Sequence, residues 1–280
     1  MPTSFEELAD SYSCIFFDAF GVLKSSAGLF PGVMEVLDEL QKRGKQVFIV
    51  TNDASKSPHR MAEGYALDGR PIVPLDHIIS SGLLAQDYLK TKVRSGYVAY
   101  LGKEASAYYI VKAGLYPIPL KDINTDDHNP KCIVLLDDEG FDWFTEINRA
   151  VNLIREHNIP VIVANTDVTY PSTPTSFNVA VGGLARLLEA ATGRGFIHFG
   201  KPDPMIFSKA FHLALEKDPK LTKGDVLMVG DTLYTDIVGG NKYGIDTALV
   251  LSGTTTEVVH RSLIQTTGIV PTYVCTSILT

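Results

Sequence analysis

Four segments of this sequence carry polar side chains that could act together on a phosphorylated molecule. Three of the segments follow short apolar runs: Asp18 follows residues 14–17, Thr51-Asn52 follows residues 47–50, and Asp231 and Asp236 follow residues 226–229. The fourth, Lys201, precedes the last of these runs. Carboxylates can act as nucleophiles or hold a divalent cation, whereas a lysine and a hydroxyl can hold an anion. Phosphoryl transfer needs positioned groups of these kinds.

Each of these residues, taken singly, has an ordinary structural explanation. An Asp after a strand usually caps a helix or forms a turn, because its carboxylate accepts hydrogen bonds from free backbone N–H groups. Lys201 alone would be a solvated lysine, and Thr51-Asn52 alone would be ordinary loop residues. The inference therefore depends on the ordered set and not on any one member.

Short apolar runs alternate with helical patterns along most of the chain, which is typical of an α/β protein. The runs predicted to be buried parallel strands are 14–17, 47–50, 98–101, 133–136, 161–164, 226–229 and 248–251. Apolar residues at helical spacing predict helices around residues 33–40, 147–154 and 184–188, the first of which should end at Gly44. In open α/β sheets ligands bind beyond the carboxyl ends of the strands, where the polar segments fall.

Length and composition limit the class of protein. The chain has 280 residues, which corresponds to roughly 1.9 domains at about 150 residues each. A net charge of −7 argues against a broad basic face for nucleic acid or anionic lipid. The acidic N-terminus does not resemble a secretory signal, and no apolar run approaches the 18 or more residues that a membrane span needs. With only three scattered cysteines, we expect a cytoplasmic protein with no membrane or nucleic-acid partner.

Two segments are predicted to be connections, because they are rich in residues that favour turns. Gly114–Lys131 is rich in Pro, Asp and Asn, and residues 170–177 form a polar stretch with two prolines. The number of predicted strands also exceeds what one sheet around a single core needs, so a domain boundary is expected.

The ordered motifs resemble those of the haloacid dehalogenase (HAD) superfamily. Ala164-Asn165-Thr166-Asp167 and Thr235-Asp236-Ile237 extend the resemblance to class IIA, the NagD-type and p-nitrophenylphosphatase-like sugar phosphatases, over essentially the whole chain. The resemblance implies a Rossmann-like core with a parallel sheet, interrupted by an inserted α/β cap domain of the C2 type. The core would comprise residues 1–82 and 183–280, and the cap would comprise residues 83–182.

The resemblance also implies a role for each motif. Asp18 would be the nucleophile, and Lys201 would neutralise the phosphoryl group and hold Asp18 in place. Thr51 and Asn52 would bind phosphate oxygens together with Lys201. Magnesium would be held by Asp18, the backbone carbonyl of Phe20, Asp231 and, through the surrounding shell, Asp236. Caps of this family often mediate dimers, so a homodimer is a further expectation.

Phe20 departs from the family pattern in a way that bears on catalysis. Most phosphatases of the superfamily have an Asp two residues after the nucleophile, which protonates the leaving oxygen; such general acid–base help contributes about 10²- to 10⁴-fold. The acid could instead come from the cap, where the candidates are His128, Asp137-Asp138-Glu139 and Asp167. Alternatively, the leaving group departs unprotonated, or hydrolysis is vestigial and the protein binds a phosphorylated metabolite.

Other functions are less consistent with the sequence. Dehalogenases and phosphonatases also lack the second Asp, but Asp231 and Asp236 together favour phosphorus chemistry. There is no P-loop, His-Glu-x-x-His or Gly-x-Ser-x-Gly motif. The leading hypothesis is a magnesium-dependent hydrolase of a small phosphorylated metabolite, with a sugar phosphate as the first guess.

Overall fold

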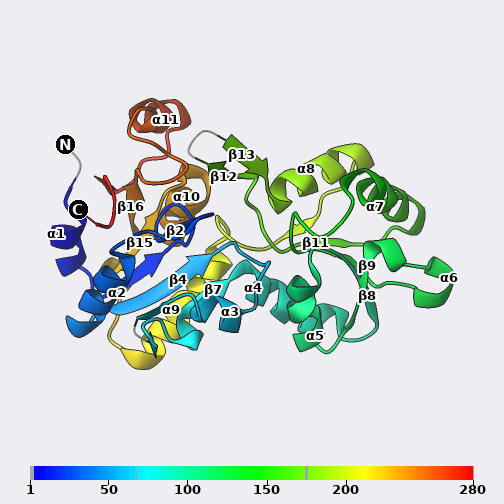
Figure 1. The fold of residues 1–280 in the computed structure, drawn as a ribbon, viewed down its shortest axis with the longest axis horizontal. Helices are drawn as coiled ribbons and strands as arrows, with labels where there is room; N and C mark the ends of the chain where they lie inside the picture. Colours follow the sequence, from blue (N-terminus) through cyan, green and yellow to red (C-terminus); the bar gives the residue numbers. More distant parts are fainter. Residues whose placement is uncertain (1–2, 68, 174–175, 280) are drawn as a thin grey trace.

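The protein forms two lobes, each built on a parallel β-sheet (Figure 1). The computed structural model describes residues 3–67, 69–173 and 176–279. Both chain termini lie in the first lobe, and the middle of the chain forms the second lobe (Figure 1). The α/β fold class predicted from the alternating apolar runs is therefore confirmed.

The first lobe contains a six-stranded sheet in which all strands are parallel. Its order is β17 (Tyr273–Cys275), β16 (Asp246–Val250), β15 (Val226–Gly230), β1 (Cys14–Phe17), β4 (Gln46–Thr51) and β7 (Ile78–Ser80). From β1 the chain proceeds outward through β4 and β7, and after the second lobe it returns at β15 and proceeds outward the other way. The pair β1–β15 is thus the switch point of the sheet, where the carboxyl ends leave a crevice for a ligand.

Helices cover both faces of this sheet, because its strands are apolar on both sides. The helices of the first lobe are α1 (Phe5–Asp10), α2 (Val33–Lys42), α3 (Pro58–Ala62), α9 (Pro204–Lys217), α10 (Val238–Tyr243) and α11 (His260–Thr267). As predicted, α2 ends before Gly44, which has a positive φ of 76°. Two small hairpins complete the lobe: β2 (Lys24–Ser25) with β3 (Gly28–Leu29), and β5 (Ala66–Leu67) with β6 (Arg70–Pro71).

The second lobe contains a five-stranded parallel sheet. Its order is β14 (Ile197–His198), β11 (Val161–Val163), β10 (Ile133–Leu135), β8 (Tyr97–Leu101) and β9 (Tyr116–Pro119). The helices of this part of the chain are α4 (Ser81–Tyr88), α5 (Tyr108–Lys112), α6 (Thr125–His128), α7 (Trp143–His157) and α8 (Val181–Thr192). Helices α7 and α8 pack on one face of the sheet, and α5 lies on the other (Figure 1).

Both segments predicted to be connections contain regular structure. The segment Gly114–Lys131 includes β9 and α6, and β9 pairs with β8 despite its prolines because it is an edge strand. Residues 170–177 fall in a hairpin of β12 (Thr169–Thr173) and β13 (Ser176–Val179); residues 174–175 lie outside the described residues. The prediction was wrong at both places, because backbone pairing with a neighbouring strand, β8 for β9 and β13 for β12, outweighed local turn composition.

The second lobe also extends beyond the end expected at residue 182. That position lies inside α8, whose Leu184 and Leu188 pack with Ile154 of α7 in one buried cluster. Strand β14 then pairs with β11 in the second sheet. The segment 183–198, predicted to be core, is therefore part of the second lobe.

A continuous apolar layer joins the two lobes. Phe16 and Phe48 of the first sheet belong to the same buried cluster as Leu84 of α4, and Tyr109 and Val134 of the second lobe. The opposite face of each sheet has its own cluster. Among the described residues, no helix combines the length and apolar character that crossing a membrane requires.

Candidate active site

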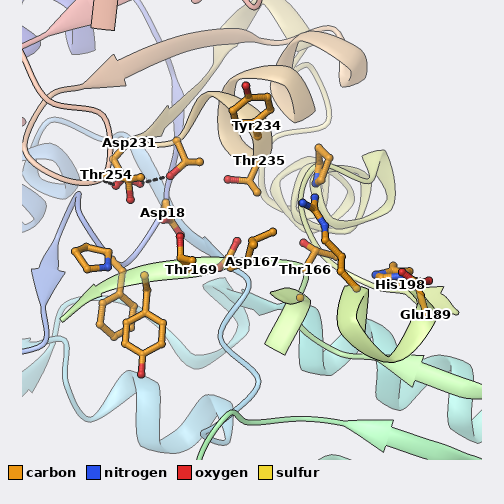
Figure 2. Close-up of a pocket in the computed structure, with 18 residues that line it drawn as sticks. Asp18, Thr166, Asp167, Thr169, Glu189, His198, Asp231, Tyr234, Thr235 and Thr254 are labelled. Atoms are coloured by element: carbon orange, nitrogen blue, oxygen red, sulfur yellow. Dashed lines mark hydrogen bonds and ion pairs between the residues drawn. The ribbon is translucent and has the colours of Figure 1, made fainter. Parts of the chain in front are cut away.

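The predicted site residues meet at the carboxyl ends of the central strands of the first sheet. Asp18 follows β1, Asp231 follows β15, and Thr51 is the last residue of β4. Because these strands are parallel neighbours around the switch point, residues more than two hundred positions apart in sequence come together. Figure 2 shows Asp18, Asp231 and Asp167 around one cavity.

Lys201 is the buried cation of the site. Its side chain is only 2% exposed, and Nζ lies 2.6 Å from Asp18 Oδ1 and 2.7 Å from Asp236 Oδ1. Burial alone would lower the pKa of Lys201, but the carboxylates of Asp18 and Asp236 outweigh it and raise the pKa above its usual value. The lysine is thus held charged, in contact with the side chain predicted to be the nucleophile.

Asp231 is fixed by the loops that surround it. Its Oδ1 accepts a hydrogen bond from Thr232 Oγ1 at 3.1 Å, and its Oδ2 accepts one from the backbone N–H of Thr254 (Figure 2). A Cβ atom at Gly21 or Gly253 would overlap the Asp231 carboxylate, so the space for this side chain depends on two glycines. The backbone here is shaped around one carboxylate at a set position.

Asp236 lies in η6 (Leu233–Ile237), a single π-helical turn after β15. Its Oδ2 accepts a hydrogen bond from the backbone N–H of Thr232 at 3.1 Å, and Oδ1 faces Lys201. Burial raises the pKa of Asp236 to about 7; the charge of Lys201 opposes this rise, and those of Asp18 and Asp231 add to it. Burial together with Asp18 raises the pKa of Asp231 to about 6. Both carboxylates are therefore destabilised as anions unless a further positive charge compensates them.

The three carboxylates form a donor set that suits a hard divalent cation. One oxygen each from Asp18, Asp231 and Asp236 lies within 4.8 Å of the others. Three acidic groups face one lysine, so the cluster has an excess of negative charge in a place shielded from water. Oxygen ligands with excess negative charge are what Mg²⁺ prefers, so the residues present fit this ion.

Thr51 and Asn52 are both buried, but the Asn52 side chain is engaged in holding the backbone. Its Nδ2 donates to the carbonyl of Lys201 at 3.1 Å, to Thr166 Oγ1 at 3.0 Å and to Asp167 Oδ1 at 2.9 Å. Its Oδ1 accepts from the Lys201 backbone N–H at 2.7 Å. Asn52 therefore ties the Lys201 loop to the loop that follows β11 of the second lobe, a role that the sequence did not reveal.

Two adjoining cavities open from Asp18 and Phe20. The larger, of about 890 Å³, extends past Asp231 to Arg186, His198 and Tyr234. The smaller, of about 260 Å³, is lined by groups from both lobes: Asp18, Thr51, Asp53, Lys103, Asp137 and Asp167. Because strands of both sheets end at the smaller cavity, the site lies between two carboxyl edges, each of which can present polar side chains.

Phe20 occupies the position where the family pattern has an acid. The Lys24 ammonium lies 4.4 Å from the centre of the Phe20 ring, and both residues are half-buried. Phenylalanine has no proton to give, so the side chain at this position can contribute contact area and a face for a cation, but no acid catalysis.

Of the other candidate acids, only some face the site. His128 contacts Tyr97 and Asn124 and lines neither cavity. Asp137, Asp138 and Glu139 line the smaller cavity, whereas Asp167 lines both. His198 lies in β14, where its Nε2 is 3.0 Å from Glu189 Oε1, and it lines the larger cavity (Figure 2).

Known proteins resemble this chain along its whole length. A model described as haloacid dehalogenase-like hydrolase matches residues 15–116, and one described as HAD-hydrolase-like matches residues 198–280. A solved structure from Cytophaga hutchinsonii, described as a possible sugar phosphatase of the HAD superfamily, is 48% identical with a TM-score of 0.94, covering 100% of this chain and 99% of that one.

Two further relatives have a lower sequence identity to this chain. Chronophin of Mus musculus is 29% identical over 244 residues, which are 85% of this chain and 80% of that protein. The acid sugar phosphatase of Staphylococcus aureus is 26% identical over 266 residues, which are 94% of this chain and 93% of the relative. The chain belongs to the haloacid dehalogenase superfamily, among its NagD-like and p-nitrophenylphosphatase-like phosphatases.

Proposed function

We propose that this protein is a magnesium-dependent phosphatase of a small phosphorylated metabolite, with a sugar phosphate as the first candidate, and that it acts through an aspartyl-phosphate on Asp18. The observation that carries the proposal is the placement of Lys201 Nζ, 2.6 Å from Asp18 and 2.7 Å from Asp236, with Asp231 in the same cluster. The names of the Cytophaga hutchinsonii and Staphylococcus aureus relatives support a sugar phosphate as substrate.

Asp18 is the group that we assign as nucleophile. Its carboxylate attacks phosphorus, an O–P bond forms, and the bond from phosphorus to the leaving oxygen breaks. Water then attacks the phosphorus of the aspartyl-phosphate, which releases inorganic phosphate and regenerates Asp18. Lys201 stabilises the negative charge on the phosphoryl oxygens and keeps the Asp18 carboxylate oriented.

The remaining motif residues bind and position the phosphoryl group. The Thr51 hydroxyl and the Asn52 backbone amide are the proposed donors to phosphate oxygens. Asp18, the Phe20 carbonyl and Asp231 are the proposed magnesium ligands, with Asp236 supporting them from the Lys201 side. When bound, the ion neutralises the charge between the Asp18 carboxylate and the phosphate dianion.

The second lobe is proposed to be the cap that selects the substrate. The division into a discontinuous core, 1–82 and 183–280, and an inserted cap, 83–182, is kept except that the cap includes α8 and β14. Arg186 and His198, which this extension adds, both line the larger cavity. A cytoplasmic location and a homodimer formed through the cap remain predictions; light scattering after gel filtration tests the second.

A steady-state assay separates hydrolysis from binding alone, the alternative that Phe20 raises. Phosphate release is measured from p-nitrophenyl phosphate and from a panel of sugar phosphates, with magnesium and with a chelator. We expect magnesium-dependent release that Asp18→Asn abolishes, while Asp53→Asn provides a matched carboxylate control in the same cavity. Tight binding of sugar phosphates without release would support the binding alternative.

A further inference from the structure

We infer that Asp167, which the inserted segment carries back to the core, donates the proton to the leaving oxygen in place of the acid that Phe20 lacks. The inference rests on the proposed phosphatase function. It assigns a general acid to a position far in sequence from the nucleophile, 149 residues after Asp18.

The position of Asp167 is the first support for this assignment. The side chain is half-buried and lines both cavities, as do Asp18 and Phe20. In Figure 2 Asp167 lies near Asp18 among the residues that line the larger cavity. A leaving group bonded to a phosphoryl group at Asp18 would extend into the space that Asp167 borders.

The second support is that Asp167 is held in place with one oxygen left available. Its Oδ1 accepts a hydrogen bond from Asn52 Nδ2 at 2.9 Å, and its backbone N–H donates to Asn165 Oδ1 at 2.8 Å. Its Oδ2 accepts no hydrogen bond from any part of the chain that the structure describes. A fixed carboxyl group with a free oxygen at the cavity wall can present a proton without a costly reorientation.

The electrostatic surroundings keep a proton on this group near neutral pH. Burial raises the pKa of Asp167 to about 7; the charge of Lys201 opposes the rise, and that of Asp18 adds to it. A general acid works best with a pKa close to the pH at which the enzyme operates. Asp167 can thus be protonated before the first step and ionised after it.

The other acidic groups near the site are less well placed. Asp53 Oδ1 accepts hydrogen bonds from both the N–H and the hydroxyl of Ser55, and the Asp138 carboxylate accepts one from Tyr170. Asp137 is the strongest alternative acid, because burial raises its pKa to about 6. However, Asp137 lines only the smaller cavity, whereas Asp167 lines both. It therefore serves as the matched control.

In the proposed reaction Asp167 gives its proton to the leaving oxygen and later regains one from water. As Asp18 attacks phosphorus, the electron pair of the breaking P–O bond moves to the leaving oxygen, which takes the proton from the Asp167 carboxyl group. The resulting Asp167 carboxylate then takes a proton from the water that attacks the aspartyl-phosphate. Asp167 ends protonated and Asp18 ends ionised, as at the start.

The test compares Asp167→Asn with Asp137→Asn on an alkyl and an aryl phosphate. The asparagine keeps an oxygen that accepts from Asn52 but has no acidic proton. We expect kcat/KM for glycerol phosphate to fall by about 10²- to 10⁴-fold, and that for p-nitrophenyl phosphate by less than about tenfold, because nitrophenolate leaves without protonation. Asp137→Asn should show no such dependence on the leaving group.

A pH profile of the unmodified protein tests the inference without any variant. Above pH of about 7, kcat/KM for the alkyl phosphate should fall as Asp167 ionises, while that for the aryl phosphate should not. Equal losses on both substrates in Asp167→Asn would mean a structural role and overturn the inference, as would a leaving-group dependence that appears in Asp137→Asn instead. Failure of the unmodified protein to release phosphate from either substrate would overturn the proposed function itself.

Discussion

At the scale of single residues, one buried lysine pairs with two of the three carboxylates of the site. Lys201 is the charged partner of both Asp18 and Asp236, and it is buried where water cannot screen these charges. Removing a positioned donor to a developing anion costs about 10² to 10³ in rate in known cases. Lys201 therefore couples orientation of the proposed nucleophile to stabilisation of the transferred group.

We predict that Lys201→Met lowers kcat/KM for p-nitrophenyl phosphate by about 10²- to 10³-fold while circular dichroism stays unchanged. Lys209→Met is the control, since Lys209 forms its ion pair with Asp87 at the surface of α9, 2.6 Å away, and should stay within about twofold of the parent. Similar losses in the two variants would show that Lys201 has no special part in the reaction.

A second prediction concerns the coupling between positions 20 and 167. If Asp167 is the acid, Phe20→Asp adds little for alkyl phosphates in the parent but restores about tenfold or more in the Asp167→Asn background. Kinetics of the four proteins on glycerol phosphate give the interaction between the two sites. Additive effects would indicate that the two positions do not share the task of protonation.

At the scale of secondary structure, these residues are placed by the topology of the sheets and by the packing of helices where the two lobes meet. The switch between β1 and β15 brings Asp18 beside Asp231, and α4 and α5 pack where the second lobe begins. In that packing the Tyr109 hydroxyl of α5 donates to the carbonyl of Lys56, at 2.6 Å, in the loop that follows Asn52. A contact between the lobes thus supports the loop that carries the proposed phosphate donors.

Gly82 in α4 gives a sharp test of this packing, because a Cβ there would overlap the Tyr109 ring. We predict that Gly82→Ala lowers the free energy of unfolding by about 1 to 3 kcal/mol, measured by urea denaturation. Gly195→Ala is the control, since nothing lies within 4 Å of its added Cβ. Equal stability of the two variants would contradict the account of this interface.

The sequence predicts buried central strands well and edge structure poorly. Strands such as β1 and β15 are apolar on both faces, so a continuous apolar run identifies them. Edge strand β9 contains two prolines, and hairpin β12–β13 is polar. Because neither has the continuous apolar run of a buried strand, the pairing of each is set by the fold. The contact between Asn52 and Asp167, 115 residues apart, is likewise set only by the fold.

At the scale of the whole molecule, the carboxyl ends of the strands in both parallel sheets face the same cavities. The first sheet supplies the charged cluster, and the loops that follow strands of the second sheet supply Asp167, Lys103 and Asp137. The shared apolar layer between the lobes holds the two edges in one arrangement.

Magnesium should stabilise the whole fold, because an ion that binds only the folded cluster shifts the unfolding equilibrium. At about 100 times its dissociation constant the gain is about 2.7 kcal/mol. We predict a rise in Tm on adding magnesium to chelator-treated protein, and a loss of that rise in Asp231→Asn. Asp225→Asn, at the opposite end of β15, is the control and should keep the rise. An equal rise in Asp231→Asn would place the ion elsewhere.

The most direct test of the central claim is to map the phosphoryl group on the enzyme. Protein mixed with p-nitrophenyl phosphate and magnesium is quenched in acid within milliseconds, digested, and analysed by mass spectrometry. We predict a phosphoryl group on Asp18 that is absent from Asp18→Asn, which also releases no phosphate. A phosphoryl group on another residue, or undiminished turnover by Asp18→Asn, would contradict it.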